Sequence, residues 1–243
     1  MYDQSAHAHA FGPAAAIYER GRPPYPAAAL DWLLPAGPSR VLDLGAGTGK
    51  LTRQLAAAGH HVTAVDPSEG MLAELRRVLP DIPAHRGSAE DIPLPDDSAD
   101  VVLMAQAWHW VDPDRAAPEI ARVLAPGGRL GVLWNLRDDR TGWVRRLEEI
   151  VGGPDGYRET RFGPLFKPVE THDVGWTHHL GPDALLDLVA SRSHVIMLPA
   201  AERAALLAQV RQLMITHPEL VGRTAYDMPF VTHCARASLA DPR

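Results

Sequence analysis

The middle of the chain alternates between short apolar runs and longer amphipathic segments. The apolar runs predict buried strands at residues 41–44, 61–65, 82–86, 100–105 and 129–134. The segments between them space apolar side chains three and four residues apart, which predicts helices at residues 48–58, 71–79 and 113–124. Regular alternation of strand and helix over residues 40–136 predicts an α/β fold with a Rossmann-like, doubly wound and mostly parallel sheet.

The regions on either side of this alternation are less regular. Further helices are predicted at residues 14–20, 26–34, 142–151, 182–191 and 199–214, and further strands at 169–180 and 226–237. Residues 152–168 are rich in glycine and proline and predict a loop. We therefore expect a single domain consisting of a helical N-terminal flap (1–39), a ligand-binding core (40–136) and a C-terminal part (137–243) with a helical substrate cap at about 182–215.

The first strand runs into a glycine loop that opens a helix, with the sequence Asp43-Leu44-Gly45-Ala46-Gly47-Thr48-Gly49. Glycine adopts positive φ and lets a ligand approach the backbone closely, so this order of strand, loop and helix predicts a nucleotide-like ligand. The G-x-G-x-G spacing differs from the G-x-G-x-x-G of dinucleotide folds. Asp43 precedes the first glycine by two residues, and its carboxylate there would repel phosphate and attract a cation.

The second strand ends in an acid, Asp66. An acid at this tip of a βαβ unit characteristically bonds the two ribose hydroxyls of an adenosine. The alternative is that Asp66 only caps the helix that follows.

The motifs DLGAGTG and VTAVDPS resemble those of the class I S-adenosylmethionine (SAM) dependent methyltransferases. The resemblance implies SAM as cofactor, S-adenosylhomocysteine (SAH) as product, no metal, and an antiparallel strand at the C-terminal end of the sheet. It implies a contact between Asp43 and the amino group of the methionine part, and ribose binding by Asp66. The other cofactor residues that it implies around these two are Gly45, Ala46, Gly47, Gly49, Pro67 and Met71.

The loop after the third strand contains Ser88, Ala89 and Glu90, where the resembling family often has G-D-A-E. In that family the aspartate bonds the adenine amino group and the next backbone N–H bonds the ring. Here a serine replaces the acid, and its hydroxyl can still accept that bond. Glu90 is either part of this site or a surface residue.

The segment Gln106-Ala107-Trp108-His109-Trp110 follows the fourth strand, at the edge where open α/β sheets bind their ligands. Gln106 is predicted on the cofactor side. Trp108 and Trp110 are predicted on the substrate side, where their π faces suit contact with a sulfonium, or else they belong to the core. His109 is a candidate general base, although a structural histidine is the more frequent case. Asn135 occupies the same edge of the fifth strand and is predicted on the substrate side.

The flap carries Tyr18, Arg22 and Tyr25 in the pattern YERGRPPYP. Together with AQAWHW and VLAPGGRLGVLWN, this pattern resembles the small-molecule methyltransferases that include the trans-aconitate enzymes (methyltransferase type 11). Tyr18 is a second candidate base. Arg22 either binds a carboxylate or only pins the flap, and Tyr25 is predicted beside the substrate.

Composition narrows the classes of molecule that the protein could bind. The net charge of −6 works against nucleic-acid substrates, because binding to phosphate backbones needs clustered cations. One cysteine excludes an internal disulfide framework and a cysteine-cluster metal site. No apolar segment reaches the roughly 18 to 20 residues that span a bilayer. We expect a cytoplasmic protein, monomer or homodimer, with a small-molecule methyl acceptor.

Together these features predict methyl transfer from SAM to oxygen, nitrogen or carboxylate of a small molecule by in-line displacement. Two alternatives stay open. One is a non-catalytic SAM-binding module, which would use the same glycines. The other is a nicotinamide-dependent Rossmann oxidoreductase, which would share the sheet and the ribose acid but predicts another glycine spacing.

Overall fold

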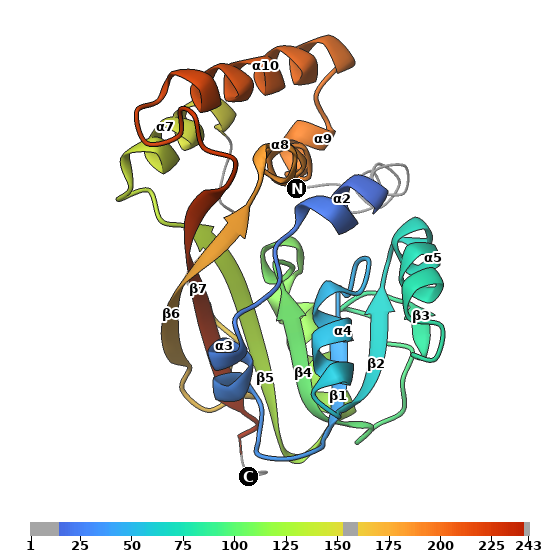
Figure 1. Cartoon of the computed structure of the whole chain (residues 1–243). Helices are drawn as coiled ribbons and strands as arrows, with labels where there is room; N and C mark the ends of the chain where they lie inside the picture. The colour runs from blue at the N-terminus through green and yellow to red at the C-terminus, as the bar shows by residue number, and fades with distance from the viewer. Residues whose placement is uncertain (1–14, 153–159, 241–243) are drawn as a thin grey trace.

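A computed structural model describes residues 15–152 and 160–240. Within them the sheet has seven strands in the order β3-β2-β1-β4-β5-β7-β6 (Figure 1). The strands are β1 (Arg40–Leu44), β2 (His61–Asp66), β3 (Ala84–Arg86), β4 (Ala99–Ala105), β5 (Leu124–Arg137), β6 (Glu170–Leu180) and β7 (Tyr226–Ser238). Strand β7 is antiparallel to both β5 and β6, and the other neighbouring strands pair in parallel. The predicted Rossmann-like α/β fold is confirmed.

Helices cover both faces of the sheet, because the inner strands are apolar on both faces. On one face α3 (Ala27–Leu33) and α4 (Lys50–Ala57) pack on alternate residues of the strands, such as Val41 and Leu103. On the opposite face α6 (Pro113–Val123) packs on the intervening residues, such as Leu42 and Val102. Helix α5 (Glu69–Val78) follows β2 and flanks the sheet beside β3.

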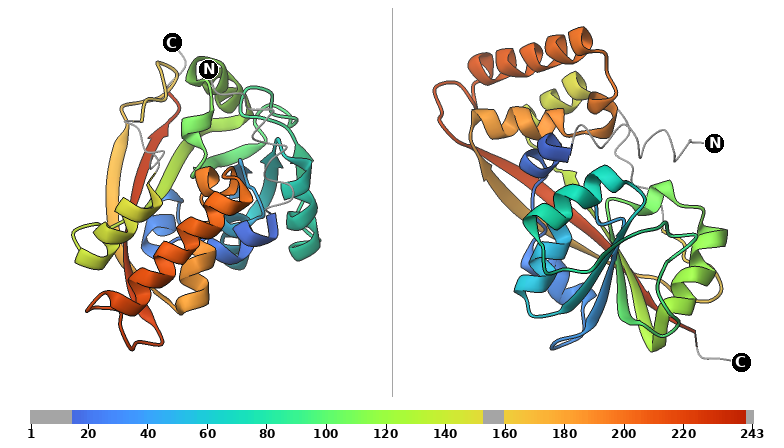
Figure 2. Two further views of the ribbon diagram at one scale, coloured as in Figure 1. Left: turned by 90° about the horizontal axis from the view of Figure 1, so that it is seen from above. Right: turned by 90° about the vertical axis from the view of Figure 1, so that its right-hand side faces the viewer.

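A group of helices lies beyond the carboxyl ends of the parallel strands and has a core of its own (Figures 1 and 2). We call it the cap; it consists of α7 (Gly142–Val151), α8 (Pro182–Ala190), α9 (Ser193–Ile196) and α10 (Ala200–Thr216). Its core also takes in the ends of β6 and β7, through residues such as Leu180 and Phe230. Helix α2 (Ala15–Gly21) lies between this cap and the edge of the sheet (Figure 1).

Three element predictions need correction. Strand β5 begins at Leu124 rather than at Arg129, and residues 125–128 form a bulge: Leu124 pairs with Ala99 and Arg129 already pairs with Val101. Strand β3 is shorter than the predicted 82–86. Helix α9 was not predicted, because four residues are too few to show a helical period. The predicted loop at 152–168 and the predicted flap lie partly outside the described residues.

Candidate active site

An open pocket lies at the carboxyl edge of β1 and β4. Its walls contain nine of the residues predicted for the site: Tyr18, Arg22, Tyr25, Asp43, Gly45, Ala46, Gly47, Gln106 and Asn135. Four further lining residues were not predicted: Pro23, Lys50, Leu51 and Ala105. The structure thus brings flap residues, the glycine loop and the ends of two neighbouring strands around one space.

Asp43 is a fully buried carboxyl at the floor of this pocket. One of its oxygens, Oδ2, accepts a hydrogen bond of 2.5 Å from the Thr52 hydroxyl. The other, Oδ1, is buried and has no hydrogen-bond partner among the described residues. Burial raises the pKa of Asp43 to about 7, and the neighbouring charge of Asp66 adds to this while the Thr52 bond opposes it. An unpartnered buried acceptor is costly, so Asp43 is suited to a cationic ligand that donates to Oδ1.

The glycine loop brings bare backbone to the pocket. Gly45 has a φ of +77°, and a Cβ there would lie 2.9 Å from the Cβ of Ala107. The N–H groups of Gly45 and Ala46 both donate to the Val65 carbonyl, which ties the loop to the end of β2. Gly49 begins α4 in the left-handed region, with a φ of +88°. Side chains at these glycines would be strained, and at Gly49 a Cβ would also lie 3.0 Å from the Leu75 and Leu79 side chains.

Asp66 at the tip of β2 holds the same loop from the other side. Its carboxylate accepts bonds of 2.8 Å from the N–H groups of Gly47 and Ser68. Burial raises its pKa to about 6, against the effect of these two bonds. Asp66 therefore has a structural role, while a carboxylate with about four acceptor positions keeps capacity for ribose hydroxyls. The capping of α5 falls instead to the Ser68 hydroxyl, which accepts from the Met71 N–H.

The flap is fastened to the loop by a residue that the sequence analysis missed, Glu19. Its carboxylate accepts from the Thr48 hydroxyl at 2.7 Å and from Arg53 at 2.8 Å, and lies 3.7 Å from the Lys50 ammonium. These contacts join α2 to the start of α4. The spacing of Glu19 in a short helix gives no hint of partners so far along the chain.

Arg22 and Tyr25 line the pocket from the flap. The Arg22 guanidinium lies over the Tyr18 ring, 4.9 Å from its centroid, and its Nε is buried without a hydrogen-bond partner among the described residues. The backbone of Tyr25 exchanges two hydrogen bonds with the Gln54 side chain. Burial raises the Tyr25 pKa well above its usual value, so its hydroxyl stays protonated. Arg22 is thus a donor without an acceptor, which suits an anionic ligand group.

In the loop predicted to contact adenine, the side chains of Ser88 and Glu90 accept hydrogen bonds from backbone N–H groups. The Ser88 hydroxyl accepts from the Glu90 N–H at 3.3 Å, and Glu90 accepts from the Asp112 N–H at 3.0 Å. Ala89 is buried in the core. These residues, with Pro67 and Met71, are not among those lining the pocket described above, so their contacts with adenine stay predictions.

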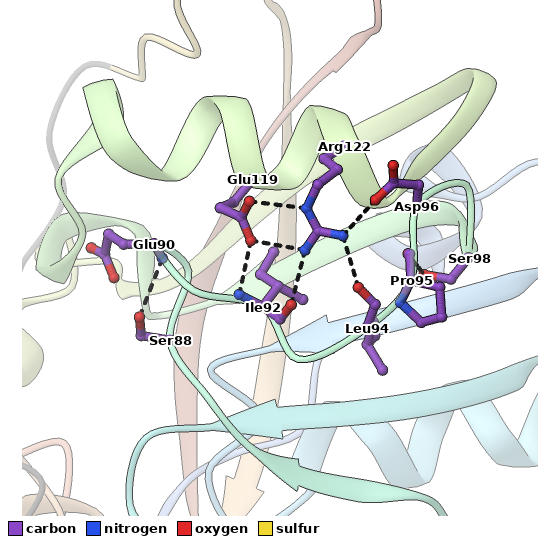
Figure 3. Close-up of polar contacts among 9 residues, drawn as sticks. All are labelled: Ser88, Glu90, Ile92, Leu94, Pro95, Asp96, Ser98, Glu119 and Arg122. Atoms are coloured by element: carbon purple, nitrogen blue, oxygen red, sulfur yellow. Dashed lines mark hydrogen bonds and ion pairs between the residues drawn. The ribbon is translucent and has the colours of Figure 1, made fainter.

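Arg122 of α6 fixes the continuation of this loop (Figure 3). Its guanidinium donates to two loop carbonyls and pairs with two carboxylates; the partners are Ile92, Leu94, Asp96 and Glu119. Glu119 in turn accepts from the Ile92 N–H at 3.1 Å. The loop after β3 is therefore held against α6.

The Trp108-His109-Trp110 segment forms a short 3-10 helix after β4 and does not line the pocket. Trp108 is 5% exposed and packs edge-on against Phe162 in the core, which favours the core alternative for this residue. The rings of His109 and Trp110 contact each other, with 4.5 Å between their centroids. The substrate roles of Trp108 and Trp110 and the base role of His109 stay predictions, and this geometry gives them no support.

Asn135 and Gln106 occupy the far wall. Gln106 has a φ of +55°, which is rare for a residue other than glycine and is typical of strained positions at ligand sites. Its side-chain amide donates to the main-chain carbonyl of Asn135 at 3.3 Å. The Asn135 amide donates to the flap carbonyl of Pro24 at 3.0 Å and accepts from the Thr232 hydroxyl at 2.6 Å. Sequence reasoning found Asn135 but not Thr232.

The pocket offers one position for a cationic group and another for an anionic group. Asp43 and the glycine loop offer an acceptor and bare backbone, and Arg22 offers a donor. Across the described ranges, no cluster of three or more His, Cys, Asp or Glu side chains could hold a metal ion. In residues 15–152 and 160–240, no helix is both long enough and apolar enough to cross a membrane.

Comparisons with known proteins identify the family. Residues 42–132 match the family model of a methyltransferase domain. An uncharacterised methyltransferase of Mycobacterium tuberculosis (strain ATCC 25618 / H37Rv) is 58% identical over 233 residues, which cover 95% of this chain and 96% of the relative. An uncharacterised methyltransferase-like protein of Schizosaccharomyces pombe is 35% identical, covering 84% of this chain and 86% of the relative.

Among solved structures, a candidate type II methyltransferase from Anaeromyxobacter dehalogenans is 26% identical with a TM-score of 0.66, covering 89% of this chain and 97% of that one. The family match and these likenesses decide against the nicotinamide-dependent oxidoreductase. With its buried acid, its glycine loop and its strand order, the chain belongs to the class I SAM-dependent methyltransferases.

Proposed function

We propose that this methyltransferase acts on a small-molecule acceptor, which binds between the flap and the carboxyl ends of β4 and β5. The observation that carries the proposal is the polarity of the pocket. Asp43 presents an unpartnered acceptor atom on one side, and Arg22 and Asn135 present donors on the other. A large acceptor would have to displace α2, which Glu19 ties to the glycine loop.

The cofactor residues divide by the part of SAM that each would hold. Asp43 accepts from the amino group of the methionine part, and the glycine loop lies along the adenosyl chain. Asp66 binds the ribose hydroxyls, with Pro67 beside it. Met71, Ser88, Ala89 and Glu90 surround the adenine, and Gln106 closes the cofactor end of the pocket. These assignments combine the resemblance with the positions of strand ends.

Bound SAM supplies a methyl group that its positive sulfur already activates for in-line displacement. The protein therefore has to align the acceptor and exclude water, effects that reach roughly 7 to 11 kcal/mol in favourable cases. Arg22, Tyr25 and Asn135 orient the acceptor. A carboxylate acceptor needs no base, whereas a hydroxyl acceptor needs one, and Tyr18 lines the pocket while His109 does not.

The resemblance of the flap and strand motifs to the trans-aconitate-like subfamily also supports a small acceptor. The motif YERGRPPYP supplies four residues of the pocket wall, Tyr18, Arg22, Pro23 and Tyr25. A macromolecular substrate would instead need an extended basic or apolar surface leading to the pocket, and the net charge of −6 does not favour a polyanion.

The test is methyl transfer from tritiated SAM to fractions of a cell extract. The fractions are small metabolites, protein and nucleic acid, and Asp43→Asn is the inactive control. We expect label in the metabolite fraction only, together with SAH binding by calorimetry. Label in protein or nucleic acid instead would refute the small-molecule acceptor, and SAH binding without transfer to any fraction would favour a non-catalytic role.

A further inference from the structure

A chain of side-chain hydrogen bonds runs across the three strands at the antiparallel edge of the sheet and ends in the pocket. It starts at the Trp176 indole on β6, passes through the Thr232 hydroxyl on β7 and reaches the Asn135 amide on β5. The two bonds measure 2.8 and 2.6 Å. Asn135 and Thr232 are register partners, so their side chains point to the same face of the sheet. We call these three residues the relay.

The relay has only one consistent hydrogen-bond direction. An indole N–H can only donate, so the Thr232 oxygen accepts from Trp176 and its single proton goes to Asn135. The atom of Asn135 that takes this proton must be its oxygen. At the other end of the amide, the Pro24 carbonyl can only accept, so the atom that faces it must be the nitrogen. Both neighbours therefore impose the same orientation on Asn135.

The fixed orientation decides what Asn135 offers to a ligand. Its oxygen is engaged by Thr232, and one of its two N–H bonds is engaged by Pro24. The second N–H is left for the pocket that Asn135 lines. The Nε of Arg22 adds another donor without a partner to the same wall, within the described residues. This wall presents donors to whatever binds there.

The surroundings of the relay hold it in place. Thr232 is fully buried. The Trp176 ring stacks on Phe230 with 5.1 Å between centroids and 20° between planes, and Phe230 belongs to the core of the cap. If the hydroxyl were removed, the indole N–H and the Asn135 oxygen would each lose their partner, and only the bond to Pro24 would still hold the amide.

We propose that Thr232 is a positioning residue, which fixes the Asn135 amide so that its N–H faces the methyl acceptor. This inference rests on the proposed function and deepens it. The acceptor then carries an oxygen that can accept a hydrogen bond at this point, as a carboxylate, a carbonyl or a hydroxyl does. An acceptor that can only donate there, such as an ammonium group, is rejected, because a site built to pair with an oxygen discriminates strongly against a group that cannot pair.

The test compares Thr232→Val, which keeps the shape and removes the hydroxyl, with Thr232→Ser, which keeps the hydroxyl. The first readout needs no acceptor: the side-chain amide signals of Asn135 in a ¹⁵N–¹H spectrum, assigned by their loss in Asn135→Asp. We expect two well-separated proton shifts in the wild type and in Thr232→Ser, and shifts moved toward those of a free amide in Thr232→Val, where only the bond to Pro24 remains. Unchanged signals in Thr232→Val would show that Thr232 does not fix the Asn135 amide.

The second readout is transfer from tritiated SAM to the metabolite fraction that is labelled by the wild type. Thr232→Val should raise the apparent KM for that acceptor by about tenfold or more and leave the KM for SAM within about twofold, while Thr232→Ser stays within about threefold of the wild type for both. If the Asn135 amide signals change in Thr232→Val but the apparent KM for the acceptor does not, Asn135 does not contact the acceptor.

Two further outcomes are covered. If Thr232→Val does not fold, Trp176→Phe removes the indole N–H and keeps the stacking on Phe230, and it should move the amide signals in the same direction. If the wild type binds SAH but transfers no methyl group, the proposed function fails and the acceptor role fails with it. The amide spectrum would then still decide whether Thr232 fixes Asn135.

Discussion

The proposed cofactor side and the proposed acceptor side of this site are built in different ways. On the proposed cofactor side, Asp43 and Asp66 lie within two residues of strand ends, Asp43 accepts from the Thr52 hydroxyl, and Asp66 accepts from the Gly47 N–H of the glycine loop. On the acceptor side, the Asn135 amide takes its orientation from Pro24 and Thr232, which are 111 and 97 residues away along the chain. The first side depends on local geometry and on buried charge, and the second on long-range contacts among neutral groups.

This difference has an energetic consequence. Both cofactor-side acids are buried, and burial raises their pKa values to about 7 and about 6. A carboxyl whose folded pKa lies above its unfolded value stabilises the fold most below the unfolded pKa, and this contribution is lost as the pH rises through the folded pKa. At neutral pH the buried carboxyls of Asp43 and Asp66 therefore lower the free energy of unfolding. The side chains of the relay are neutral and carry no such cost.

Asp43→Asn tests the role of buried charge on the proposed cofactor side most directly. The amide still accepts from Thr52 but removes the charge that would pair with the amino group of the ligand. We expect SAH affinity to fall by about a hundredfold, because breaking a buried charged hydrogen bond costs about 2 to 5 kcal/mol. The apo protein should melt about 2 to 8 °C higher at pH 8, because a buried charge is gone. Calorimetry and thermal melts measure the two effects.

These two effects have opposite signs, so a damaged fold cannot produce them together. Thr52→Val is the matched control, since it removes the hydrogen bond to Asp43 and keeps the charge. A higher melting temperature with unchanged SAH affinity would show that Asp43 does not touch the ligand.

Asp66→Ala should have the next largest effect. It removes the acceptor for ribose hydroxyls and for the Gly47 and Ser68 N–H groups, so we expect SAH to bind more than tenfold weaker with the fold intact. Calorimetry measures the affinity, and circular dichroism checks the fold. Asp66→Asn, which keeps one carbonyl oxygen, should lie between the alanine variant and the wild type. Unchanged affinity in Asp66→Ala would leave Asp66 with its loop-holding role alone.

The cofactor side was also the more predictable from sequence. Motif spacing fixed Asp43 and Asp66 relative to strand ends, because a strand, a loop and a helix follow one another within a few residues there. Lys50 and Leu51, which were not predicted as lining residues, directly follow the last glycine of this loop.

The acceptor side resisted prediction for a physical reason. Thr232 lies in a strand whose inward positions are otherwise apolar, with Phe230 before it and Cys234 after it. A lone polar residue in such a row signals a buried hydrogen bond, but the sequence does not say with which partner. Trp108 misled in the opposite way, since an aromatic residue just past a strand end suits a pocket wall and packs in the core here.

Titration offers a third test. The amino group of the ligand needs the Asp43 carboxylate, so binding is linked to loss of a proton from a group with a pKa of about 7. SAH affinity should therefore be highest above pH 8 and about tenfold weaker at pH 6, as the fraction of charged Asp43 falls. Calorimetry in buffers of different ionisation enthalpy should detect proton release near pH 6.5. In Asp43→Asn the profile should flatten, and a steep wild-type-like profile there would assign the titration to another group.

A smaller effect is expected from Ser88→Asp, which restores the acid found at this place in the resembling family. A carboxylate accepts a stronger hydrogen bond than a hydroxyl, by about 1 kcal/mol, so SAH should bind about threefold to fivefold tighter. Ser88→Ala is the control and should bind slightly weaker than the wild type. If Ser88→Asp weakens binding, the loop that Arg122 holds does not face the adenine.

The smallest effect on SAH is expected from the cap. There the Glu148 carboxylate lies between Arg137 and Arg192, whose side chains are only 7% and 10% exposed. Glu148→Gln removes the charge that both guanidinium groups share, so we expect a loss of about 1 to 3 kcal/mol and a melting temperature lower by about 3 to 10 °C. Glu149→Gln removes an exposed pair with Arg146 and should change the melting temperature by about 1 °C or less.

SAH affinity should stay within about twofold of the wild type in both cap variants, because the core of the cap is separate from the cores under the glycine loop. The route by which this expectation could fail is visible: Arg20 of α2 pairs with Asp187 of α8 at 3.1 Å, and α2 is fastened to the loop through Glu19. A parallel loss of SAH affinity and stability in Glu148→Gln, absent in Glu149→Gln, would mean that α2 transmits the state of the cap to the cofactor. The two sides of the pocket would then be energetically one unit, despite their different construction.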